Sequence, residues 1–381
     1  MSSSFNMISV SYTWGFLLFG AAALAFITST AGKYLKSATR SSIKKRDLVV
    51  PEKLPEDAYY SISPLKDFDV DTEEPIKARP FKPKFHMTMA IENITLSEFI
   101  VKDKTYHERI KMRRKLLADE HHEVVGTNPK ASPAVLEMYK WLTHTYLPDR
   151  FPTMFSLTPT GLLNKTTQET LPLSPTSATH ALELMGSHID NDFLFLLPSS
   201  APEDDGKYRL EAFITCFPSG FNTRTKLGHL LAAIHGPVPH YQQKLERSMD
   251  KFFAMLPVGK IVRRWNWTIS TSGDLFRAKG LHATPEQAAR ESRDVHLQTT
   301  GLRCERQTLH RLPESKAVVF AFKTYQYPIA QLRDEGSGEA LCEAIDGVET
   351  GSVPGMAVYK RQVVWAGKVK AFLRGEIDVD A

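Results

Sequence analysis

The stretch at residues 226–269 constrains the fold more than any other part of this chain. An apolar run ends at His235, and the Gly-Pro-Val-Pro sequence that follows fixes the backbone at two prolines. Apolar side chains then recur at three- and four-residue spacing over residues 241–256, which predicts a helix that ends at a Pro-Val-Gly turn. Residues 264–269 alternate between polar side chains and tryptophan or isoleucine, which predicts a strand. A domain that contains both helices and strands follows from this order.

Further strands and helices are predicted around this stretch. Two pairs of runs have the alternation and the turns of hairpins, at 192–197 with 208–217 and at 302–313 with 317–325. An edge strand is predicted near 84–91. Helical spacing occurs at 106–118, 132–147, 328–345 and 356–373. This mixture predicts an α+β domain.

The composition limits the class of protein. With 381 residues, of which 42% are hydrophobic and 24% charged, the chain is long enough for one large domain or two smaller ones. The formal net charge is +5, but the basic residues gather at 33–46 and 102–115 without interleaved aromatic residues, which argues against nucleic-acid binding. Three cysteines without C-x-x-C spacing argue against a disulfide framework and a cysteine zinc site, so a reducing compartment fits best.

The N-terminal region contains an apolar segment without charges at residues 10–27. A membrane-spanning helix needs roughly 20 such residues, and the basic residues follow this segment and do not precede it, which predicts a single-pass membrane protein whose C-terminal domain is cytosolic. A cleaved signal peptide is the alternative, since residues 29–31 resemble a cleavage site, but the basic flank favours an anchor. We therefore divide the chain into an anchor at 1–32, a basic and polar linker at 33–80 and a soluble domain at 81–381.

His235 is the first candidate for chemistry, because dinucleotide-binding, P-loop, nucleophile-elbow and zincin signatures are missing from the sequence. A histidine held rigidly in an apolar wall is what an axial haem ligand requires. A lone histidine in such a place is, however, more often a hydrogen-bonded core residue. The pattern alone leaves both interpretations open.

Four further polar residues lie on predicted strands. Arg264 and Asn266 share one face and have N–H groups to donate to a cofactor or substrate. Arg306 and Gln307 should point to opposite faces of their strand. An arginine beside an apolar pocket commonly pairs with a carboxylate, for which a haem propionate, a folate glutamate or a protein aspartate would serve. A surface ion pair of Arg306 with Glu305 or Glu314 is the simpler interpretation.

Four motifs in a fixed order give the chain a resemblance to a known family. They are I-H-G-P-V-P-x-Y at 234–241, L-x-x-S-M-D-x-F-F at 245–253, R-x-N-W-x-I at 264–269 and L-R-x-E-R-Q-T-L-x-R-L-P at 302–313. With weaker echoes elsewhere, the chain resembles the haem-dependent oxidative N-demethylase family, also called the HRQ family, over roughly residues 80–330.

The resemblance implies a PAS-like α+β fold, with an antiparallel sheet flanked by helices and a histidine on the haem iron. Carried over to the matching positions, His235 would be the iron ligand, and Arg306 and Gln307 would complete the His-Arg-Gln set near haem or substrate. In the amine-oxidising members, haem activates O₂ to remove a methyl group from a small amine. A separate flavin and iron–sulfur reductase supplies the electrons, and a folate can capture the formaldehyde. The resemblance thus implies a haem monooxygenase. The predicted membrane anchor is a departure from the bacterial members, and both together predict a membrane-anchored haem monooxygenase.

Two other functions fit the same sequence. A haem-binding sensor or carrier would keep the pocket without catalysis, and a haem-free scaffold tethered to the membrane would keep only the fold, because fold alone does not decide function. If His235 were not the iron ligand, His229 or Cys216 would be the next candidates.

Overall fold

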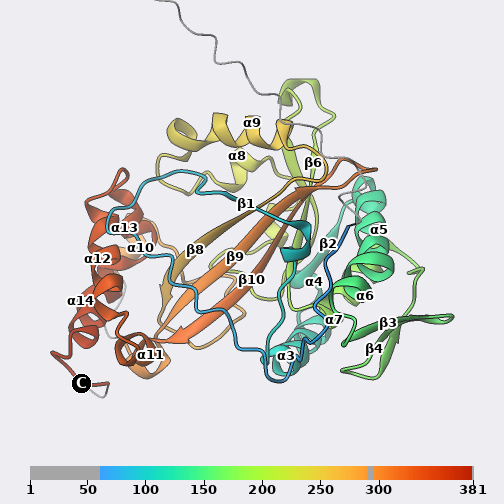
Figure 1. Ribbon diagram of the computed structural model, residues 1–381. Helices are drawn as coiled ribbons and strands as arrows, with labels where there is room; N and C mark the ends of the chain where they lie inside the picture. Colours follow the sequence, from blue (N-terminus) through green and yellow to red (C-terminus); the bar gives the residue numbers. More distant parts are fainter. Residues whose placement is uncertain (1–60, 291–294, 380–381) are drawn as a thin grey trace, which may run out of the picture. The chain divides into compact units, whose positions relative to one another are not determined.

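The computed structural model describes residues 61–290 and 295–379, which belong to one compact unit. A seven-stranded antiparallel sheet with the order β1-β8-β9-β10-β6-β7-β2 forms its centre (Figure 1). Its strands are β1 (Glu92–Ile94), β2 (Val125–Thr127), β6 (Asp192–Pro198), β7 (Tyr208–Ile214), β8 (Ile261–Ser270), β9 (Gly301–Arg311) and β10 (Val318–Pro328). A smaller sheet contains β3 (Phe155–Thr158), β4 (Gly161–Asn164) and β5 (Glu169–Leu171). The fold is α+β with a large antiparallel sheet, as the sequence predicts.

The three long strands β8, β9 and β10 place alternate side chains on opposite sides of the sheet. Arg264 lies opposite Gln307, and Trp265 lies opposite Arg306. We call the two sides the Arg264 face and the Trp265 face. Both predicted hairpins are confirmed, because β6 pairs with β7 and β9 pairs with β10 in antiparallel register.

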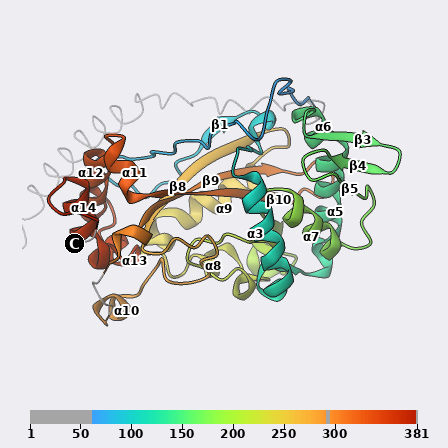
Figure 2. The ribbon, with the colours of Figure 1, turned by 90° about the horizontal axis from the view of Figure 1, so that it is seen from below.

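Helices cover the two ends of the Trp265 face, and the chain segment before residue 104 crosses it between them, where the Phe99 carbonyl accepts from Arg306 (Figure 1). Two hydrophobic clusters join the strands to helices. Figures 1 and 2 show these two helix groups at opposite ends of the long strands. One group is α3 (Tyr106–Asp119), α5 (Ser132–Trp141), α6 (Leu147–Arg150) and α7 (Ala178–His188). The other is α11 (Ile329–Asp334), α12 (Gly338–Glu349), α13 (Gly355–Tyr359) and α14 (Gln362–Leu373). The Trp265 face is therefore the main core of the unit.

The Arg264 face is apolar only at one end. There α8 (Leu231–Ile234) and α9 (Arg247–Met255) lie across the strands (Figure 2). A third cluster packs Leu231 and Phe253 from this layer against Val262 and Leu309 of the sheet. The predicted helix at 241–256 is confirmed, although its first part, Gln242–Glu246, has π-helical hydrogen bonding.

Three predicted elements differ from the structure. The helix predicted at 328–345 is interrupted at Gly336, whose φ of +81° suits the end of α11, and α12 begins just beyond it. The helix predicted at 356–373 is interrupted at Arg361, where φ is +56°, between α13 and α14. The predicted edge strand lies not at 84–91 but at β1, which pairs with β8.

The N-terminal segment was predicted as a membrane anchor and a linker. Residues 10–27 lie outside the described residues. Within 61–290 and 295–379, no helix has both the length and the apolar character for a bilayer span. The described part of the predicted linker, 61–80, contributes Ile62, Val70 and Ala78 to the buried core.

Candidate functional site

His235 lies at the end of the short helix α8, and only Gly236 separates it from the first of the two prolines. Its side chain is partly buried and stacks on the ring of Tyr241, with centroids 4.8 Å apart and an angle of 14° between the planes. Its backbone N–H donates to the Leu231 carbonyl at 3.0 Å, which continues the helical turn. The helix end and the tyrosine thus hold the imidazole in one orientation.

The hydrogen bond of the ring determines the tautomer of His235. Nδ1 lies 2.8 Å from the Leu231 carbonyl oxygen, and because a carbonyl can only accept, Nδ1 has the proton. Burial lowers the pKa of His235 to about 4, so the ring is neutral at pH 7 and Nε2 keeps a lone pair. Metal-bound histidines commonly have this arrangement, in which the second ring nitrogen donates to a backbone carbonyl.

Polar side chains continue along the Arg264 face beyond the apolar end. Gln307 donates from Nε2 to Glu305 at 2.8 Å, and Asn266 donates to the same carboxylate oxygen at 3.3 Å. The Gln307 Oε1 atom and the Arg264 Nε atom are buried without a hydrogen-bond partner among the described residues. Burial lowers the pKa of Arg264, and Glu305 opposes that shift. This face therefore offers an unused donor and an unused acceptor beside one carboxylate.

Arg306 is on the Trp265 face, away from these groups. Its side chain is 1% exposed, and it donates to the carbonyl oxygens of Phe99, at 3.1 Å, and Glu98. The opposite directions predicted for Arg306 and Gln307 are confirmed by the strand register. The simpler interpretation of Arg306 as a surface residue paired with Glu305 or Glu314 is wrong, since its side chain is buried and donates to backbone carbonyls. The structure thus brings together His235, Arg264, Asn266 and Gln307, but not Arg306.

A second histidine, His282, lies near the same face. Its Nδ1 donates to the Gly220 carbonyl at 3.3 Å, and its ring stacks on Tyr359 with centroids 4.3 Å apart. A Cβ at Gly220 would lie 2.8 Å from this imidazole, and the glycine has a φ of +81°, so glycine suits this close approach. Burial lowers the pKa of His282 to about 4. His282 is therefore also neutral with a lone pair on Nε2.

Arg303 holds the loops that contain Gly220 and lead to His282. This arginine, on the Arg264 face of β9, is 1% exposed. Its Nε donates to Ser219 Oγ at 2.7 Å, and its Nη2 donates to the carbonyls of Phe217 and Leu275 at 3.0 and 2.8 Å. One buried guanidinium thus connects both loops to the sheet.

Two lysines add positive charge between the histidines. Lys226 donates to the Ile234 carbonyl at 3.0 Å, at the end of α8, and its charge opposes protonation of both His235 and His282. Lys360 donates to the Trp267 carbonyl and lies 3.5 Å from Asn266 Oδ1. Burial lowers the pKa of Lys360 to about 8, and the charge of Arg264 adds to this shift. We call the set Lys226, His235, Arg264, Asn266, His282, Glu305, Gln307 and Lys360 the polar cluster.

The residues that the sequence interpretation missed come from loops and helix ends. His282 follows a G-L dipeptide, and Lys360 follows α13, so neither lies in a pattern that indicates function. Glu305 was considered only as a partner for Arg306. Alternation alone could have indicated that Glu305 shares a face with Gln307. The other candidates for the iron ligand are less suitable, since His229 is exposed and burial raises the pKa of the Cys216 thiol to about 12.

The fold and the polar cluster together define a class. They make an α+β domain in which neutral imidazoles and basic side chains meet on one face of an antiparallel sheet, which suits an anionic ligand or prosthetic group. A family model described as haem-dependent oxidative N-demethylase, alpha subunit-like, matches residues 90–370. This match extends over most of the chain, and the protein belongs to that family.

Proposed function

We propose that this protein is a haem-dependent oxidoreductase that removes a methyl group oxidatively from a small amine, with His235 as the iron ligand. The observation that supports this most is the neutral, fixed imidazole of His235, whose Nε2 atom forms no hydrogen bond with the described residues, in a chain of a haem-dependent family. Haem iron needs such a nitrogen donor from the protein.

The charges of the polar cluster fit the rest of a haem group. Lys226, Arg264 and Lys360 all have pKa values lowered by burial, which means that each is short of compensating negative charge. A haem has two propionate carboxylates, and arginine pairs with carboxylates through its planar fork. The Arg264 Nε atom, which has no hydrogen-bond partner in the described part of the chain, is the donor that would bind one of them. The cationic side chains and haem therefore complement each other in charge.

The remaining polar groups would position the substrate. Haem, when bound, supplies the activation of O₂ with electrons from outside the chain. Glu305 holds the amides of Asn266 and Gln307, which leaves the buried Gln307 Oε1 as an acceptor for an amine N–H. The carboxylate of Glu305 would favour a protonated amine over a neutral one. A small amine thus meets both an acceptor and a negative charge on this face.

The proposal extends to the partners and the location of the protein. An oxidative demethylation needs two electrons from a donor outside the chain, for which a separate flavin and iron–sulfur reductase is our proposal. The reaction releases formaldehyde, and a folate would be a suitable acceptor for it. Residues 10–27 would anchor the chain in a membrane with the domain in the cytosol.

Haem titration of the full chain tests the iron ligand. We expect a Soret band that His235→Ala abolishes or shifts, while His229→Ala, at an exposed site, leaves it unchanged. His282 has the same ring geometry, so His282→Ala belongs in the same series. Loss of the band in His282→Ala alone would move the ligand to His282, and an unchanged spectrum in both variants would contradict a histidine ligand in the polar cluster.

The same titration tests the propionate contact with two neighbouring arginines. Arg264→Gln should weaken haem binding roughly tenfold, as expected for the loss of one charge-assisted contact, with the Soret position unchanged. Arg263→Gln is the matched control, because Arg263 lies on the Trp265 face and pairs with Glu92 at 2.8 Å. Equal losses in both variants would mean that the effect is one of general charge.

Turnover separates the enzyme from the two other functions. With a reductase and candidate methylamines, we expect O₂ consumption and formaldehyde release, and we expect the two to occur together. A protein that binds and reduces haem but stays inert with all amines would be a sensor or carrier. A full chain without a Soret band after haem addition would be the haem-free scaffold.

A further inference from the structure

A second site lies away from the polar cluster, where the loop before β1 meets the start of α3 and the end of β10. A pocket of about 240 Å³ is lined there by residues that include Lys77, Lys104, Arg109, Tyr325 and Tyr327. With about 30 Å³ for each water in the liquid, this space suits a small ligand. Tyr325 and Tyr327 lie on the Trp265 face of the sheet, opposite the polar cluster, and Gln326 contributes to the lining from the other face at the end of β10.

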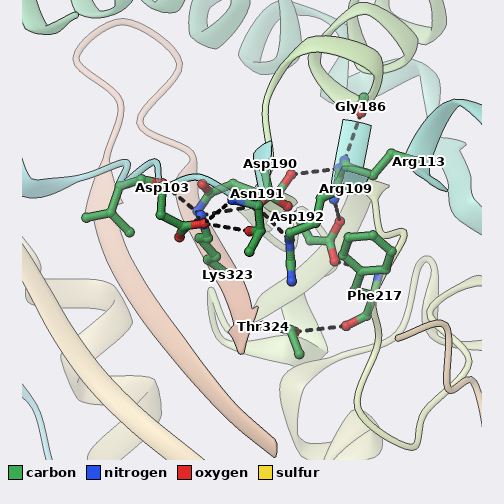
Figure 3. A network of polar contacts seen from close by, with 12 residues as sticks. Asp103, Arg109, Arg113, Gly186, Asp190, Asn191, Asp192, Phe217, Lys323 and Thr324 are labelled. Carbon is green, nitrogen blue, oxygen red and sulfur yellow. Dashed lines mark hydrogen bonds and ion pairs between the residues drawn. The ribbon is translucent and has the colours of Figure 1, made fainter. Parts of the chain in front are cut away.

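A network of buried charged residues holds the inner wall of this pocket (Figure 3). Lys323 Nζ lies 2.7 Å from Asp103 Oδ2 and 3.1 Å from Asp190 Oδ2, and Arg109 Nε donates to the same Asp190 oxygen at 2.7 Å. Although burial raises it, the pKa of Asp190 is held at about 2 by Arg109 and Lys323. The carboxylate thus stays charged and fixes the arginine.

Arg109 still has an unused donor. The residue is 7% exposed, and its guanidinium carbon lies 4.8 Å from the centre of the Phe217 ring, so it cannot turn freely. Its Nη2 is buried and has no hydrogen-bond partner among the described residues. A buried N–H without an acceptor is costly. A ligand oxygen in the pocket would remove that cost.

Two parallel tyrosines in the pocket differ in their hydroxyl groups. The rings of Tyr325 and Tyr327 are parallel to within 4°, with centroids 6.2 Å apart. The Tyr327 hydroxyl accepts from the backbone N–H of Ala78 at 3.1 Å and donates to the Ile76 carbonyl. The Tyr325 hydroxyl is buried in a residue only 4% exposed and has no partner among the described residues. Burial raises the pKa of Tyr325, so this hydroxyl keeps its proton as a donor.

The pocket lining has an excess of positive charge. It contains Lys77, Lys104 and Arg109 with one carboxylate, Glu74. Glu74 is exposed and forms an ion pair with Lys104 at 2.6 Å, and such an exposed pair contributes little. Two buried donors together with these lysines favour a ligand with several negative acceptor oxygens.

We propose that this pocket binds a small oxyanion, a carboxylate or a phosphate, through Arg109 Nη2 and the Tyr325 hydroxyl. The site is independent of haem and of the proposed demethylation. The tyrosine rings would pack against the body of an organic carboxylate. A free phosphate would use the same two donors.

Calorimetric titration of the full chain in detergent, with sodium benzoate and with inorganic phosphate at constant ionic strength, tests this site. We expect saturable binding of at least one of them, weakened roughly tenfold or more by Tyr325→Phe, because a hydrogen bond to a charged group is lost. Tyr325→Phe should leave the Tm unchanged or slightly higher without ligand, since its hydroxyl has no partner to lose within 61–290 and 295–379. Tyr327→Phe is the matched control. It should lower the Tm, while its affinity for the bound probe stays within about twofold of that of the unaltered chain.

The outcomes separate the ligand classes and can overturn the proposal. Binding of phosphate alone would assign the site to a phosphate group, and binding of benzoate alone to an organic carboxylate. The proposal would be overturned if neither probe gave saturation, or if Tyr325→Phe bound as tightly as the unaltered chain. A loss of Tm in Tyr325→Phe as large as that in Tyr327→Phe would also overturn it, because the hydroxyl would then have a structural partner.

Discussion

Lys102 is a buried amine without a hydrogen-bond partner among the described residues. Its side chain is 4% exposed, and Nζ lies 4.4 Å from the centre of the Tyr106 ring and 5.2 Å from that of Phe155. Burial lowers the pKa of Lys102 to about 7, with Lys323 acting in the same direction and Asp190 against it. The folded protein therefore binds fewer protons here than the unfolded chain between about pH 7 and 10.5, and stability rises with pH across that window.

Replacement of Lys102 by methionine tests this pH dependence. We expect Lys102→Met to raise the free energy of unfolding by roughly 2–4 kcal/mol at pH 6, where the cost of the buried amine is complete. The gain should shrink toward pH 10. Urea unfolding at both pH values measures it, with Lys104→Met at an exposed site as the control. An equal gain at both pH values would contradict the lowered pKa.

The residues of the polar cluster were predictable only in part. His235, Arg264 and Asn266 lie within one stretch of sequence, where an apolar run, two prolines and an alternating strand mark them. His282 and Lys360 come from a loop and a helix end far along the chain. Their place beside the sheet depends on Arg303, whose buried guanidinium holds the loops. Long-range contacts of this kind leave no local pattern.

At the scale of elements, regular alternation and helical spacing predicted β6 to β10 and most helices correctly. The two errors in the helices occurred where a single backbone conformation overrides the spacing. Gly336 and Arg361 both have positive φ and end a helical turn inside an apolar pattern that continues beyond them. The small sheet of β3 to β5 was not predicted, because its strands are only three or four residues long.

Arg311 at the end of β9 fixes α9 to the sheet and is a test of that layer. It donates to the carbonyls of Leu256 and Lys316 at 2.6 Å, to Tyr208 Oη at 2.9 Å and to the Phe253 carbonyl. Arg311→Met should lower the free energy of unfolding by about 2–4 kcal/mol, because buried acceptors lose their donor.

Urea unfolding at pH 7 measures this change. Arg247→Met, at the exposed start of α9, should stay within about 0.5 kcal/mol and is the control. A stable Arg311→Met protein would mean that the apolar contacts of α9 with Val262 and Leu309 suffice to hold the helix.

At the scale of the whole molecule, the compact unit includes residues before 81, where the soluble domain was predicted to begin. Ile62, Val70 and Ala78 are buried in the core, and the Ala78 N–H donates to Tyr327. A shortened chain therefore has to begin before residue 61 to keep these contacts. The polar character of this segment hid its role, because a few apolar residues without periodicity predict a linker.

The anchor proposed for residues 10–27 leads to a prediction about the whole protein. The full chain should stay with membranes after a carbonate wash, because its apolar segment would be buried in the bilayer. A chain without residues 1–32 lacks that segment and should be released. Protease added to the cytosolic side should digest the domain, as the basic flank after the apolar segment requires. Cleavage near residues 29–31, seen as a shortened mature N-terminus, would contradict the anchor and establish a signal peptide. The exposed sequon at Asn93 reports the orientation independently, because a glycosidase-sensitive shift in mass would place the domain on the lumenal side.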